Sequence, residues 1–176
     1  MRYFLIISFH LFISPLFYGQ LSGVWQGIMI KDGATNDQST LVFAYFEISD
    51  GKVSGNTRNE MYDTDMFAVK KIRGTSSQNK LSFTEFVIEK KKNNSRINWC
   101  NISADLTYND STGYLSGRYT SSDCKRNNGK IILYRSKSEF PKDEESALSQ
   151  VWFSRFLIDL KKGYNAPEIR EKERKS

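Results

Sequence analysis

Short runs of β-branched and aromatic residues, separated by turn signals, occupy most of this chain. Asp50-Gly51 and the stretch from Asn109 to Gly113 are turn sequences of the kind that join neighbouring antiparallel strands. Little helical periodicity interrupts the pattern before residue 136. The predicted strands span residues 21–31, 40–49, 52–61, 66–74, 81–88, 97–108, 114–122 and 130–135. The pattern therefore predicts a mainly-β chain in which consecutive strands pair.

An open meander of this kind would leave two strand edges unpaired, and such edges invite aggregation. Pairing of the first and last strands removes both edges. We therefore predict an eight-stranded antiparallel up-and-down β-barrel followed by a C-terminal α-helix. The interior of an eight-stranded barrel is just large enough to be filled by side chains or to hold one small ligand.

The first 19 residues read as a signal peptide. Arg2 supplies a positive charge, residues 3–17 are almost wholly apolar, and Gly19 offers a small residue for cleavage. We expect export to a periplasmic or extracellular location. We do not expect an integral membrane protein, since the apolar run is short for a span. The single histidine, His10, would leave with this segment, so the mature chain would lack Ser-His, Cys-His and His-metal chemistry.

The predicted domain organisation is a barrel over residues 20–136, an amphipathic helix over residues 137–163 and a charged tail over residues 164–176. Pro141 suits the first position of a helix. Leu148, Trp152, Phe156 and Leu160 recur every four residues and form an apolar stripe. We expect the stripe to pack on the outside or the open end of the barrel, or to dock onto a partner protein.

Two cysteines remain after the leader, Cys100 and Cys124. In an oxidising compartment this even, minimal count favours one disulfide, which would stabilise the fold by about 3 kcal/mol. Two separate thiols are the alternative. The formal net charge of +6 is spread along the chain, and no basic stripe accompanies it, so we do not expect nucleic-acid binding.

Aromatic residues on the predicted strands would serve either as core or as the walls of a ligand pocket. For a pocket, the predicted ligand-binding residues are Tyr45, Arg58, Glu85 and Trp99. Acid–base chemistry would have to use carboxylates such as Glu47, Glu60 or Glu85. Each of these is better explained as a surface group or an ion-pair partner. We assign no catalytic residue, no metal ligand and no cofactor.

Gly23-x-Trp25 in the first strand, with Arg135 ending the eighth, resembles the pattern of lipocalins and the wider calycin group. The resemblance implies that Trp25 closes one end of the barrel and that Arg135 packs across its ring, with Gly23 as a third structural residue. Avidin-like barrels resemble the chain equally. Residues 163–174 faintly resemble the connector before OmpA-like domains in secreted proteins of Bacteroidetes, which implies a link to the cell envelope.

The expected function is that of an exported, non-catalytic barrel that binds a small apolar or amphipathic ligand in its lumen. The alternative is a cell-envelope interaction or structural domain whose barrel is packed and whose C-terminal helix docks onto an envelope protein. The two hypotheses differ in the interior. A void of a few hundred Å³ favours the ligand, and a filled interior favours the interaction domain.

Overall fold

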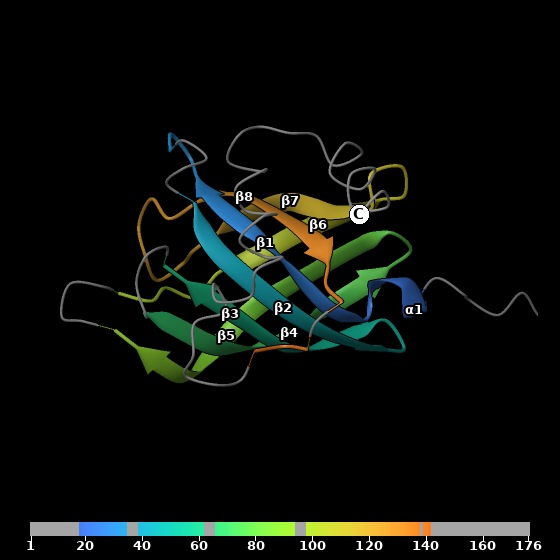
Figure 1. The fold of residues 1–176 in the computed structure, drawn as a ribbon, viewed down its shortest axis with the longest axis horizontal. Coiled ribbons are helices and arrows are strands. Elements are labelled where there is room, and N and C mark those ends of the chain that lie inside the picture. The colour runs from blue at the N-terminus through green and yellow to red at the C-terminus, as the bar shows by residue number, and fades with distance from the viewer. Residues whose placement is uncertain (1–17, 35–38, 62–65, 94–97, 138, 142–176) are drawn as a thin grey trace, which may run out of the picture.

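The computed structural model describes residues 18–34, 39–61, 66–93, 98–137 and 139–141, which form a closed β-barrel (Figure 1). Most of the predicted leader and of the predicted C-terminal helix, and the whole charged tail, lie outside these ranges. Within the ranges, no helix has the length and apolarity needed to cross a membrane. The elements are α1 (Tyr18–Leu21), β1 (Gly23–Lys31), β2 (Thr40–Ser49), β3 (Lys52–Glu60), β4 (Phe67–Ser77), β5 (Lys80–Lys92), β6 (Ser103–Asn109), β7 (Tyr114–Thr120) and β8 (Gly129–Arg135).

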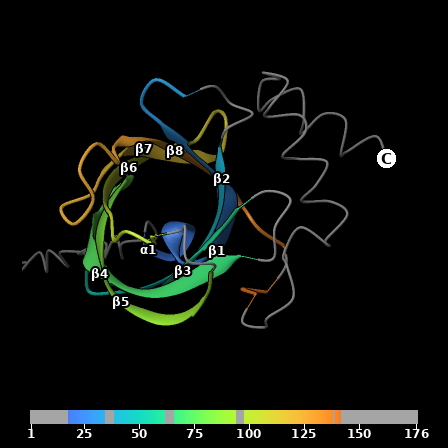
Figure 2. The same cartoon turned by 90° about the vertical axis from the view of Figure 1, so that its left-hand side faces the viewer.

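Each strand pairs antiparallel with the next, and β8 pairs with β1, so the barrel has no open edge (Figure 2). In the closing pair Trp25 lies opposite Arg135 and Lys31 lies opposite Gly129. The predicted mainly-β, eight-stranded antiparallel barrel is confirmed. The clearest difference in bounds is at β6, which begins at Ser103 instead of residue 97.

Tight turns join the strands at one end of the barrel. The β2–β3 turn places Asp50 at φ 50° and Gly51 at φ 74°, both in the left-handed region that two-residue hairpins require. In the β6–β7 turn the side-chain oxygen of Asn109 accepts the backbone N–H groups of Ser111 and Thr112 at 3.0 and 3.1 Å. The connections at the opposite end are longer, and they frame the site described below.

Glycine is required where neighbouring strands approach most closely. A Cβ atom on Gly117 would lie 1.9 Å from the backbone oxygen of Asp105, and one on Gly74 would lie 1.9 Å from that of Ser82. Neither oxygen is the end of a flexible side chain, so any larger residue would force the backbone apart. These glycines therefore mark places where two strand backbones approach closely, which is a common role of glycine within strands.

The lumen is apolar near the tight turns and polar towards the other end. Side chains that alternate inward along the strands form the main core, which includes Trp25, Phe46, Ile72, Phe83, Leu106 and Leu133. Further along the same inward rows of β3, β4 and β5 lie Thr57, Asn59, Lys70 and Glu85, all buried. One half of the interior is thus conventional core, and the other contains buried polar groups that need partners.

Strand β5 breaks its alternation near its middle. Alternation over residues 81–88 predicts that Leu81, Phe83 and Val87 share one face. Leu81 and Phe83 do face the core, but Val87 is 43% exposed. The β4–β5 register shifts between Lys71 and Ile72, because β5 contains one extra residue at this point. This bulge reverses the phase of the side chains beyond it and turns Val87 outward.

A second buried group lies on the outside of the barrel. Because inward and outward residues alternate, several buried residues of β1 to β4 must point away from the lumen. We call them the outer β1–β4 face: Ile28, Leu41, Phe43, Arg58, Glu60 and Phe67, each with at most 1% of its surface exposed. Outward residues of β5 differ, since Phe86 is 42% exposed.

Candidate ligand-binding site

The end of the barrel with the tight turns is closed by Trp25, which is 1% exposed. The indole N–H donates to the backbone oxygen of Leu21 at 2.9 Å, which fixes α1 beneath the ring. The Arg135 guanidinium lies 5.2 Å from the ring centroid and donates to the backbone oxygen of Gln20 at 2.9 Å. The packing of Arg135 across Trp25, implied by the resemblance, is therefore confirmed.

Gly23 is needed at this end for two reasons. Its φ of 112° lies in a region that L side chains rarely adopt, and a Cβ atom would lie 2.9 Å from a guanidinium nitrogen of Arg135. The ring of Tyr108 packs edge-on against Trp25 with centroids 5.9 Å apart. The closed end is thus a cluster of packed side chains around Trp25.

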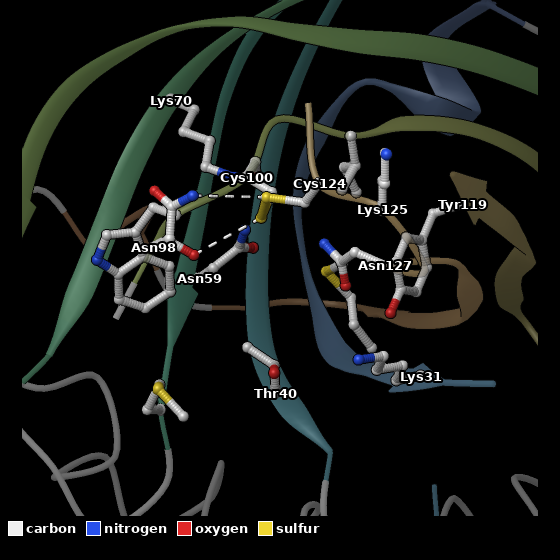
Figure 3. Close-up of a pocket in the computed structure, with 14 residues that line it drawn as sticks. Lys31, Thr40, Asn59, Lys70, Asn98, Cys100, Tyr119, Cys124, Lys125 and Asn127 are labelled. Atoms are coloured by element: carbon white, nitrogen blue, oxygen red, sulfur yellow. Dashed lines mark hydrogen bonds between the residues drawn. A yellow bond between two sulfur atoms is a disulfide. The ribbon is translucent and has the colours of Figure 1, made fainter. Parts of the chain in front are cut away.

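The opposite end contains a pocket of about 360 Å³ (Figure 3). It occupies the polar half of the lumen and opens among the longer connections. Asn127, Tyr119 and Lys31 turn their polar tips towards the space that they share with Asn59 and Thr40 (Figure 3). The lining consists of Met29, Lys31, Thr40, Asn59, Met61, Lys70, Asn98, Trp99, Cys100, Ile102, Tyr119, Cys124, Lys125 and Asn127.

The predicted disulfide between Cys100 and Cys124 is present, with Cα atoms 5.8 Å apart. It ties the connection before β6 to the connection before β8, and both sulfurs line the pocket. A disulfide is consistent with an oxidising compartment. The side chain of Asp123 lies beside the two sulfurs, but bonded sulfurs offer no thiolate, so this trio does not form a metal site in the oxidised protein.

Asp123 adds a second link between the same two connections. Its carboxylate accepts the Asn101 backbone N–H at 3.0 Å and the Ser121 hydroxyl at 2.7 Å. These hydrogen bonds, that of Asn101 first, hold the pKa of Asp123 below its usual value. The rim of the pocket is therefore fixed by one covalent bond and one ionised carboxylate.

The floor of the pocket contains a buried ion pair. Lys70 Nζ lies 2.6 Å from Glu85 Oε2, and both side chains are almost fully buried. Lys70 also donates to the backbone oxygen of Cys100, and Glu85 accepts the Thr57 hydroxyl at 2.5 Å and the Ile102 N–H at 3.0 Å. The pair thus has the additional hydrogen bonds that two buried charges need.

Rings and thioethers supply the apolar part of the lining, from Trp99, Tyr119, Met29, Met61 and Ile102. Burial raises the pKa of the Tyr119 phenol, and the nearby Asp32 carboxylate raises it further. The phenol is therefore protonated at neutral pH and offers a hydrogen-bond donor. A pocket with apolar walls and a few convergent polar groups is typical of small-molecule sites.

The four predicted ligand-binding residues are not brought together. Trp99 lines the pocket. Glu85 does not line it but forms an ion pair with Lys70, which does. Tyr45 and Arg58 are on the outward faces of β2 and β3. Tyr45 is 37% exposed, whereas Arg58 is buried, with Nε 2.6 Å from Glu60 Oε1 and its guanidinium 4.0 Å from the Phe67 ring centroid.

The carboxylates considered for acid–base chemistry are also separated. Glu60 belongs to the outer β1–β4 face, Glu85 faces the lumen, and Glu47 is exposed. None of the three lines the pocket. The structure therefore does not bring these three carboxylates together around the pocket.

Sequence reasoning missed most of the lining, including Lys31, Asn59, Lys125 and Asn127. The sequence does contain one signal for the position of the pocket, which is the length of the connections. In an up-and-down barrel, every second connection emerges at the same end, and here the longer ones, around residues 32–39, 61–66, 93–102 and 121–128, share that end. Residues that flank long connections at one end are the natural lining of a lumen mouth.

Comparison of the chain with protein-family models, with curated proteins and with solved structures finds no match.

Proposed function

We propose that this protein is an exported, non-catalytic β-barrel that binds one small amphipathic ligand in the open end of its lumen. The single observation that carries the proposal is the pocket of about 360 Å³ between the polar half of the core and the disulfide-linked rim. Its volume lies within the range of about 300–1,000 Å³ that is usual for small-molecule sites.

The lining favours an amphipathic over a purely apolar ligand. Rings and thioethers alternate with Asn59, Asn98 and Asn127, whose amides can both donate and accept hydrogen bonds. A purely apolar molecule would bury these polar groups without partners, which costs free energy. A calycin-like origin, inferred from Gly23, Trp25 and Arg135, agrees with this use of the lumen.

The alternative, an envelope interaction domain, requires a filled barrel and a docking helix. The open-end pocket argues against a filled barrel. We therefore favour ligand binding.

Native mass spectrometry of the purified full chain tests the proposal through any co-purifying small molecule. A second test is titration with phenylnaphthylamine, a neutral dye whose fluorescence rises when it leaves water. We expect saturable binding at one site. Thr40→Trp, which adds bulk inside the pocket, should abolish the signal, whereas Tyr45→Trp, on the outward side of the same strand, should not.

The proposal would be contradicted if the protein carries no co-purifying molecule and gives no saturable signal with this dye or with anilinonaphthalene sulfonate, a similar dye that is anionic. Equal loss of signal in the Thr40→Trp and Tyr45→Trp variants would place the site elsewhere.

A further inference from the structure

Among the described residues that line the open-end pocket, the charged side chains are all basic. They are Lys31, Lys70 and Lys125, and none of the other described lining residues is Asp or Glu. They come from three separate parts of the chain, namely the end of β1, the middle of β4 and the connection before β8. Ammonium groups at the mouth of a small cavity that are not neutralised raise the local concentration of anions.

Two of the three lysines are not neutralised by an acidic partner among the described residues. Lys70 is neutralised by Glu85 at 2.6 Å. Within the described residues, the ammonium groups of Lys31 and Lys125 make no ion pair or hydrogen bond. The nearby carboxylates have other partners, since Asp32 lies 2.5 Å from Arg118 and Asp123 accepts hydrogen bonds from Asn101 and Ser121.

The apolar residues Trp99, Met29 and Ile102 line the same pocket as the lysines. A ligand that fills this space would therefore present an apolar body to the lumen and a negative charge to the mouth. We propose that the pocket selects anionic amphipathic molecules, with Lys31 and Lys125 as the residues that hold the carboxylate, phosphate or sulfonate. This inference rests on the proposed function and specifies its ligand class.

A pair of dyes that differ in charge tests the inference. Anilinonaphthalene sulfonate and phenylnaphthylamine have similar ring systems, but only the first carries an anion. We expect the wild-type protein to bind the sulfonate more tightly than the neutral dye. Lys31→Gln combined with Lys125→Gln should weaken binding of the sulfonate about tenfold, which corresponds to about 1.4 kcal/mol, and leave the neutral dye unaffected.

The matched control is Lys52→Gln combined with Lys80→Gln. These exposed lysines lie at hairpin tips of the closed end, and their loss changes the net charge equally. We expect no change in the affinity for either dye. Raising the salt concentration should weaken the binding of the sulfonate dye only, because screening acts on charged partners.

Competition then identifies the anion. Octanoate and octyl phosphate should both displace the sulfonate dye, and octanol should not. The competitor with the higher affinity identifies the preferred headgroup. Equal affinity for both dyes, or displacement by octanol as effective as by octanoate, would overturn the anion inference and leave ligand binding intact. Failure of both dyes to bind would overturn the proposed function as well.

Discussion

The two ends of the barrel are built from the same strands but differ in what fills them. At the closed end Trp25, Arg135 and Tyr108 pack against one another, and the connections are tight turns. At the open end the inward rows contain Asn59 and Lys70, and the longer connections leave a pocket of about 360 Å³. In this barrel, the position of a residue along its strand therefore decides whether its side chain packs at the closed end or lines the pocket.

The largest expected effect is at the closed end. Trp25→Ala should destabilise the protein by about 5 kcal/mol, at the upper end for loss of a buried indole, because the guanidinium packing and the Leu21 hydrogen bond are lost with it. Chemical denaturation measures this loss. Dye affinity under native conditions should be unchanged. A variant that remains as stable as the wild type would show that Trp25 does not close the barrel.

Breaking the ion pair beneath the pocket should have the next largest effect. Lys70→Met leaves the Glu85 carboxylate buried and unpaired, which should cost about 3–4 kcal/mol. The neighbouring Lys71→Met is the control, because Lys71 pairs with Glu89 on the surface and should contribute less than 1 kcal/mol. Equal unfolding midpoints for the two variants would contradict the role given to Lys70.

Removal of the disulfide should affect the open end selectively. Cys100→Ser combined with Cys124→Ser should reduce stability by about 3 kcal/mol and weaken dye binding, because the linked connections form the rim. Fluorescence titration and denaturation measure the two effects. Lost stability with unchanged binding would mean that the rim does not shape the pocket.

The smallest effect is a pH dependence at the same rim. Because hydrogen bonds lower the folded-state pKa of Asp123, its contribution is present above the unfolded value of about 3.9 and disappears as the pH falls through the lower folded value. Asp123→Asn should therefore be less stable than the wild type at neutral pH, with a difference that shrinks in acid. A difference that grows in acid would contradict this assignment.

The closed end could be predicted from the sequence, and the open end could not. Strand alternation and Asp50-Gly51 are local signals that predict the barrel. The packing of Arg135 across Trp25 was predicted from a resemblance in a few residues. Lys31 and Lys125 are 94 positions apart in sequence. Only the order and lengths of the connections bring them to one pocket.

Two local features explain the particular differences. The β5 bulge turned Val87 outward, and periodicity in the sequence does not reveal an extra residue in one strand. Arg58 and Tyr45 were assigned to a pocket because of their chemistry, but their parity on β3 and β2 places both outside the barrel. The register of a strand, which decides its two faces, depends on pairing partners that the strand's own sequence does not name.

Nuclear magnetic resonance of the backbone amides during titration with anilinonaphthalene sulfonate tests the contrast between the two ends most directly. We predict shifts at residues 98–100, 119 and 125–127, which surround the pocket, and none at residues 21–25, 108 and 135 around the indole. Shifts centred on the Trp25 cluster, or spread over the outward faces of the strands, would contradict a ligand site at the open end.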